Sequence, residues 1–171
     1  MMIKLSVYSF LTGLYLAVLQ FGFVILLQIN ISSTYLTYVL IVASWLVGSL
    51  AGLWLKRLEG GLGLVLSLLS YYAVYGLVTQ WPFGQVTLFL SALGAGIAGL
   101  WAGNFFVFMI GRFKSVGSLF FHENNGFLLG IFIFFLGFTQ LGRDFIIWMP
   151  GVWGSMLLIL HYWIIRFSPV V

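Results

Sequence analysis

Residues 86–110 read VTLFLSALGAGIAGLWAGNFFVFMI, without a single Asp, Glu, Lys or Arg. A helix rises 1.5 Å per residue, so this run is long enough to cross the ~30 Å hydrocarbon core of a bilayer. Similar apolar runs recur along the chain, separated by turn and polar residues. With residues 86–110, the predicted spans are residues 5–28, 34–55, 62–80, 117–140 and 145–165.

The composition leaves little polar surface to face water. Of the 171 residues, 63% are hydrophobic and 6% are charged, and the mean hydropathy is +1.17. A soluble domain carries roughly 25% charged residues. Six spans with short loops use up the length, so we predict an all-α, polytopic membrane protein with a single six-helix domain over residues 1–171.

The distribution of basic residues predicts the orientation. If the spans alternate, Arg143, next to Asp144, lies on one side and every other basic residue on the opposite side. Those residues are Lys4, Lys56, Arg57, Arg112, Lys114 and Arg166. Lys and Arg mark the cytoplasmic side. We therefore predict a multi-pass protein of a bacterial inner membrane with both termini in the cytoplasm. The basic residues form no stripe, so nucleic acid is not an expected partner.

Small residues recur at every fourth position in three of the predicted helices. In lipid, this spacing lets helix backbones approach closely. The stripes are Ser44, Gly48 and Gly52; Ser91, Ala95, Gly99 and Gly103; and Gly126, Gly130 and Gly137. We expect the second, fourth and fifth helices to pack tightly in the bundle. The alternative is that glycine is simply common in membrane helices.

Four consecutive polar residues, His122 to Asn125, interrupt the fifth apolar run. At 100° per residue they point nearly all round a helix, so they cannot all face one interior. They lie near the headgroups, on an unwound segment, or beside a polar cavity. Glu123 shares a face with Gly126 and Gly130, so we expect it to point into the bundle.

An intramembrane carboxylate is a functional-site hypothesis by default. The expected partners of Glu123 are Asn104 and His161, which should lie in the same cytoplasmic half. The candidate ligand-binding residues are therefore Glu123, His122, Asn104, Asn124 and His161.

Three interpretations of this cluster remain open. It is a satisfied structural network, a site for a cation, proton or small polar ligand, or a haem b site with His122 and His161 as axial ligands. The last would make the chain an electron-transfer subunit that carries haem or a quinone site. A histidine–carboxylate metal site has too few ligands to be favoured.

Two motif matches are rejected on context. Gly94-Ala-Gly-Ile-Ala-Gly99 matches a dinucleotide fingerprint but lies inside an apolar helix, without the required strand. His122-Glu123 begins like a zinc-protease motif, but Gly126 stands where the second histidine is needed. The chain shows no Ser-His-Asp set with a plausible elbow, no phosphate loop and no paired acids, so we expect no catalytic residues, no bound metal and no enzymatic activity.

Three stretches resemble the membrane portion of bacterial spermidine-synthase-like proteins, itself similar to half of a major facilitator transporter. Leu46-Val-Gly-Ser-Leu-Ala-Gly52, with Lys56-Arg57 after it, resembles the second helix and its basic exit loop. Gly111-Arg112 to Gly117 resembles the link into the fifth helix. Phe120-Phe-His-Glu-Asn-Asn-Gly-Phe-Leu-Leu-Gly130 resembles that helix itself.

The resemblance implies a six-helix membrane domain that associates with a second copy or a partner subunit, because half a transporter needs another half to enclose a path. It departs from the family at Lys56, where major facilitator proteins typically carry an aspartate. No aminopropyltransferase domain is recognised in the 171 residues, so the resemblance does not imply polyamine synthesis. The expected function is to bind or conduct a small polar or cationic species, or to serve as the membrane subunit of a larger assembly.

Overall fold

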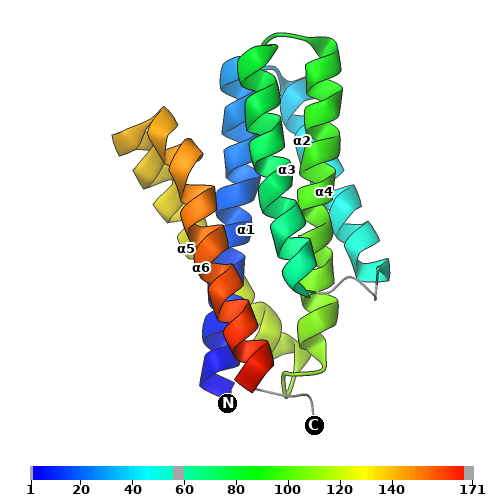
Figure 1. The fold of residues 1–171 in the computed structure, drawn as a ribbon, viewed down its shortest axis with the longest axis vertical. Helices are drawn as coiled ribbons and strands as arrows, with labels where there is room; N and C mark the ends of the chain where they lie inside the picture. The colour runs from blue at the N-terminus through cyan, green and yellow to red at the C-terminus, as the bar shows by residue number, and fades with distance from the viewer. Residues whose placement is uncertain (1, 56–59, 168–171) are drawn as a thin grey trace.

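The computed structural model, which describes residues 2–55 and 60–167, is all-helical and has six helices (Figure 1). They are α1 (Met2–Asn30), α2 (Tyr35–Trp54), α3 (Gly60–Gln80), α4 (Gln85–Ile110), α5 (Val116–Leu141) and α6 (Arg143–Phe167). All six are long and apolar enough to cross a membrane. Their limits lie within three residues of the predicted ones.

The helices alternate in direction, so α1 begins and α6 ends at the same end of the bundle (Figure 1). The connection from α4 to α5, which contains Arg112 and Lys114, lies at this end too. Arg143 begins α6 at the opposite end. The described basic residues thus sort between the two ends as predicted, while Lys56 and Arg57 lie outside the described residues.

Short, capped connections fix where the helices begin and end. The hydroxyls of Thr34 and Ser115 accept backbone N–H groups at the starts of α2 and α5. Gly142 alone separates α5 from α6, and its φ of 56° lies in the left-handed region that favours glycine. Asp144, predicted to lie in a loop, instead falls in the first turn of α6, where a carboxylate suits the helix dipole.

The glycine stripes lie at helix contacts, but they do not join the three helices as predicted. α2 packs extensively on α4, whereas α5 packs on α1 and touches α4 only slightly. A Cβ atom built on Gly130 would lie 2.7 Å from the carbonyl oxygen of Leu14 in α1. Small residues at this spacing permit a close approach without specifying the partner, so the sequence predicted the contact surface but not the pairing.

The main helix pairs of the two halves of the chain correspond, and the corresponding helices run in opposite directions. α1 pairs with α5 as α4 pairs with α2, and α6 lies against α1 as α3 lies against α4. The close backbone approaches also match. Where a glycine meets a backbone carbonyl group in the α1–α5 pair, a glycine at the corresponding position meets the corresponding carbonyl group in the α2–α4 pair. The matching approaches are Gly13 to Glu123 and Gly99 to Trp45, Gly126 to Phe10 and Gly48 to Gly96, and Gly130 to Leu14 and Gly52 to Leu100.

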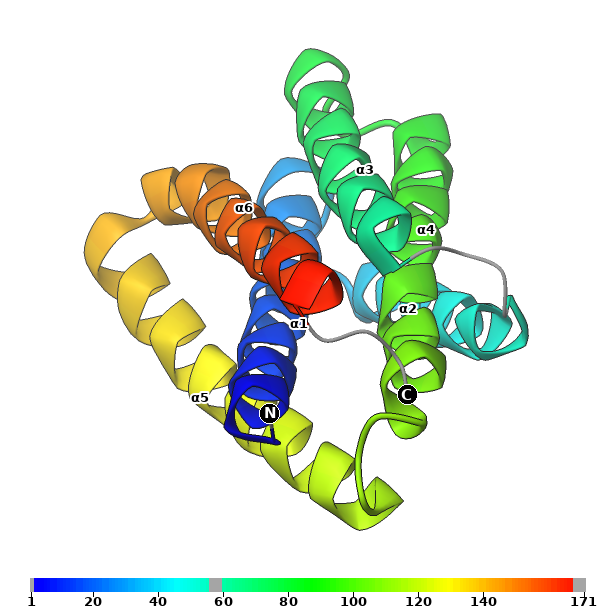
Figure 2. The same cartoon turned by 60° about the horizontal axis from the view of Figure 1, so that its bottom comes forward.

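Each of the first three helices therefore corresponds to the helix three places later in the chain: α1 to α4, α2 to α5 and α3 to α6. The two members of each pair run in opposite directions through the bundle (Figure 1). A short sequence match accompanies this inverted repeat: Gly13-Leu-Tyr15 corresponds to Gly99-Leu-Trp101. Tyr15 and Trp101 are both fully buried and anchor the core. α1 and α4 form the inside of the bundle, and Figure 2 shows α5 crossing α1 on one side while α3 and α4 lie on the other.

Candidate functional site

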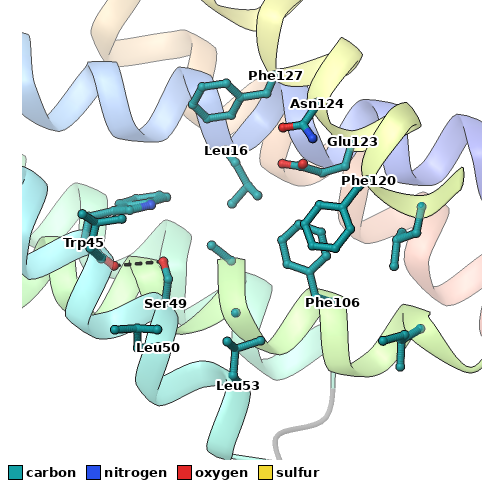
Figure 3. Close-up of a pocket in the computed structure, with 15 residues that line it drawn as sticks. Leu16, Trp45, Ser49, Leu50, Leu53, Phe106, Phe120, Glu123, Asn124 and Phe127 are labelled. Atoms are coloured by element: carbon teal, nitrogen blue, oxygen red, sulfur yellow. Dashed lines mark hydrogen bonds between the residues drawn. The ribbon is translucent and has the colours of Figure 1, made fainter. Parts of the chain in front are cut away.

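A cavity of about 520 Å³ lies between the α2–α4 pair and α5, with α1 contributing to its wall (Figure 3). It occupies the place where α4 and α5 touch only slightly. Its lining residues are Leu16, Trp45, Leu46, Ser49, Leu50, Leu53, Ala102, Gly103, Phe106, Ile110, Leu119, Phe120, Glu123, Asn124 and Phe127. Leu53, Ile110 and Leu119 lie where α2 and α4 end and α5 begins, so the cavity extends toward the end that holds both termini.

The cavity lies where the two repeats meet. Four pairs of corresponding residues line it from both sides: Leu16 with Ala102, Trp45 with Glu123, Leu46 with Asn124, and Ser49 with Phe127. Two of these pairs differ in chemistry, because an indole and a leucine in α2 correspond to a carboxylate and an amide in α5. Transporters built from inverted repeats place their ligand sites at such an interface.

The cavity walls are mainly apolar and aromatic. Rings of Trp45, Phe106, Phe120 and Phe127 come from three different helices. Phe106 of α4 stacks on Phe120 of α5, with ring centroids 4.6 Å apart and an interplanar angle of 19°. This ring pair forms a contact between two helices that otherwise barely meet.

Glu123 supplies a carboxylate to the wall of the cavity. The residue is only 6% exposed, and its side chain makes no hydrogen bond or ion pair within the described part of the chain. Figure 3 shows the carboxylate of Glu123 and the amide of Asn124 side by side, directed toward the cavity. The stripe Gly126–Gly130 fixes this orientation by holding α5 against α1, where the Glu123 backbone carbonyl faces Gly13.

Burying a carboxylate without a partner costs several kcal/mol, and the cost is larger in lipid than at an aqueous surface. Asn124 is exposed toward the cavity. Ser49 differs from both because its hydroxyl already donates to the carbonyl of Trp45, at 2.9 Å. The arrangement therefore offers a negative group and an amide to a ligand that supplies positive charge.

The other predicted site residues lie elsewhere. Asn104 is buried in α4, where its Nδ2 donates to the carbonyl of Leu55 at 2.9 Å and its Oδ1 has no partner in the described structure. His161 of α6 is 1% exposed, and its Nδ1 lies 2.7 Å from the Tyr8 hydroxyl. Neither residue makes a hydrogen bond with Glu123 among the described residues, in contrast to the partners expected from their depth.

His122 points away from the cavity. It lines a shallow depression beside α1 with Ile3, Ser6, Val7 and Phe10, and its ring lies near Phe113 and Phe121. Neither histidine lines the cavity beside Glu123. Haem ligation by His122 and His161 stays a prediction that no observation favours. Within residues 2–55 and 60–167, no group of three or more His, Cys, Asp or Glu side chains is placed to hold a metal ion.

Comparisons with protein-family models, with curated proteins and with solved structures find no match.

Of the predicted site residues, Glu123 and Asn124 line the cavity, whereas the aromatic residues of its walls were not predicted from the sequence. One signal was present, because Phe120 and Phe127 flank Glu123 at helical spacing and so share its side of α5. Nothing comparable in the sequence pointed to Trp45 and Phe106. They line the cavity because α2 packs on α4, and this pairing could not be predicted from either helix alone.

Proposed function

We propose that the chain is a non-enzymatic membrane module that binds a small cationic or polar species at Glu123 and passes it into or across the bilayer. One observation carries this proposal: the Glu123 carboxylate is buried in a spanning helix, has no partner among the described residues, and lines a cavity at the junction of the two repeats. Intramembrane ionisable groups of this kind mark ligand and ion pathways. The resemblance to half of a major facilitator transporter supports the same function.

The proposal places the chain in a bacterial inner membrane, with the cavity extending toward the cytoplasmic end. The positive-inside rule supports this orientation, because most of the described basic residues lie at the end that holds both termini. On this basis the ligand enters or leaves at the cytoplasmic face.

The proposal also includes a second copy of the chain or a partner membrane subunit. Only 28% of the apolar central segment of α2, and of that of α5, is buried within the chain, against 72% for α1. On α5, Asn124 and Asn125 are exposed roughly 12 Å along the helix from Val116, at 1.5 Å per residue. The Asn125 amide is satisfied by the Phe121 carbonyl at 2.6 Å, whereas Asn124 retains its capacity for a ligand or a partner chain.

Thermal unfolding of the purified chain tests the proposal. A ligand that binds only the folded state raises the midpoint by mass action. Sodium, potassium, spermidine and benzyltrimethylammonium are titrated against the wild type, Glu123→Gln and the matched control Asp144→Asn, which removes an exposed carboxylate far from the cavity. We expect at least one of these cations to raise the midpoint of the wild type and of Asp144→Asn but not of Glu123→Gln. If Glu123→Gln responds to every probe as the wild type does, the proposal is wrong.

A further inference from the structure

We infer that the ligand held at Glu123 is an organic ammonium ion with an apolar or aromatic body, rather than an inorganic cation. This inference rests on the proposed function and names its ligand class. It follows from the oxygen donors around the carboxylate, from the rings that face it, and from the volume and charge of the cavity.

The donor set is too small for a hard divalent cation. Hard divalent cations take six to eight oxygen ligands in proteins, or keep several waters of their own. Among the described side chains that line the cavity, oxygen comes from Glu123, Asn124 and Ser49 alone. Aliphatic and aromatic side chains form the rest of the wall and cannot replace a hydration shell.

The same wall suits an organic cation. An ammonium group is attracted to the faces of aromatic rings within about 6 Å, and Trp is the most favourable of them. The Trp45 ring of α2 lies across the cavity from Glu123 of α5, and Phe120 and Phe127 flank the carboxylate (Figure 3). A cation seated here would have a carboxylate partner and aromatic rings around it.

The cavity volume fits a small organic molecule. At about 520 Å³ the cavity falls within the ~300–1,000 Å³ typical of ligand pockets, which are mostly apolar with a few placed polar groups. The head group lies at Glu123 and Asn124, and the body extends along Leu50 and Leu53 toward the end that holds the termini.

Charge favours this ligand over the other apolar occupants. A lipid acyl chain or an apolar helix seated in the cavity would seal an unpaired carboxylate away from water, which is strongly unfavourable. An organic cation fills the same apolar volume and neutralises the charge. The chain itself supplies no cation to Glu123 among the described residues, so a bound organic cation would be its charge partner.

The test is isothermal titration calorimetry on the full chain in lipid nanodiscs, with empty nanodiscs subtracted. The probes are benzyltrimethylammonium, tetramethylammonium, which lacks the aromatic body, and neutral benzyl alcohol. We expect benzyltrimethylammonium to bind at least ten-fold more tightly than tetramethylammonium. Glu123→Gln should weaken its binding at least ten-fold and leave the benzyl alcohol signal unchanged, whereas Glu123→Asp should retain part of the affinity.

Two more variants locate the site. Trp45→Leu should weaken benzyltrimethylammonium binding several-fold, because it removes the ring opposite the carboxylate, and Asp144→Asn should leave it unchanged. Circular dichroism and size-exclusion chromatography establish that each variant is folded.

Three results overturn the inference, and they are distinguishable. Glu123-dependent binding of tetramethylammonium that is tighter than that of benzyltrimethylammonium, or a Glu123-dependent rise of the unfolding midpoint with sodium or potassium alone, shows that the ligand class is wrong while the proposed function stands. Binding of benzyltrimethylammonium that Glu123→Gln does not weaken shows that the cation lies elsewhere. If no probe binds in a Glu123-dependent way, the inference and the proposed function both fail.

Discussion

Replacing Gly126 by alanine should separate α5 from α1, because the two backbones leave no room for a methyl group. A Cβ atom at this position would overlap the carbonyl oxygen of Phe10 and lie 2.6 Å from its carbonyl carbon and 2.9 Å from its Cα. Ordinary carbon contacts are about 3.5–4.0 Å. The atoms in the way are backbone, so the helices must move apart by several tenths of an ångström or more, and contacts along their shared length are lost.

The magnitude follows from two opposed effects. Overpacking of a close interface costs about 1–3 kcal/mol. Alanine in place of glycine inside a helix gains about 0.5–1 kcal/mol where space is free. Gly126→Ala should therefore destabilise the fold by about 1–2 kcal/mol. The matched control is Gly117→Ala in the same helix, where a Cβ atom meets nothing within 4 Å; its stability should be unchanged or slightly raised.

Equilibrium unfolding in mixed micelles, in which the fraction of dodecyl sulfate is increased stepwise, measures both variants against the wild type by far-UV circular dichroism. If Gly126→Ala proves as stable as Gly117→Ala, the close α1–α5 approach is wrong. The orientation of Glu123 would then lose its structural basis.

Three other predictions concern separate features. Glu123→Gln, measured without added cations, should raise the free energy of unfolding by about 1–3 kcal/mol, because it removes a buried carboxylate that has no partner among the described residues. Asp144→Asn should not raise it, and a loss of stability in Glu123→Gln would indicate a satisfied carboxylate. Gly142→Ala should destabilise the α5–α6 turn by about 1 kcal/mol, since its φ of 56° disfavours a side chain; an unchanged midpoint would argue against this turn. The chain has no cysteine, so Lys114→Cys and Arg143→Cys each give a single thiol. A membrane-impermeant maleimide should label the thiol at position 114 only from the cytoplasm and the thiol at position 143 only from outside. Labelling of both thiols from the same side would overturn the alternating topology.

The spans could be predicted because hydropathy is a local property of the chain. Residues 86–110 contain no charge, and the described α4 differs from that prediction by a single residue at its start. Helix pairing is not local. The stripe at Gly126 and Gly130 indicated a close contact, but nothing in its spacing distinguished α1 from α4 as the partner.

The polar cluster shows the same division. Four consecutive polar residues were predicted to point nearly all round their helix, and they do: Glu123 is buried at the cavity, Asn124 faces it, Asn125 is exposed, and His122 lies on the side of α1. Sequence distance from the helix ends gave the depth of Asn104 and His161 but not the side of the bundle they face. Their expected contact with Glu123 therefore did not follow.

The inverted repeat explains why the site could not be read from one helix alone. Trp45 of α2 and Glu123 of α5 lie on opposite walls of the cavity. They occupy corresponding positions in the two repeats, and this correspondence is visible only from the helix contacts. The sequence trace of the repeat is short, since Gly13-Leu-Tyr15 and Gly99-Leu-Trp101 share two identical residues and one aromatic. The two halves of the chain share close backbone contacts more than they share side-chain identities.

Chemical labelling of Glu123 tests most directly whether this carboxylate faces a cavity that holds a cation. Dicyclohexylcarbodiimide, an apolar reagent for carboxyl groups in membranes, is added to the chain in nanodiscs, and the modified residue is identified by peptide mass spectrometry. The account predicts modification at Glu123 and a rate that falls as benzyltrimethylammonium is added. An unreactive Glu123, or a rate that none of the cations named above alters, would contradict it.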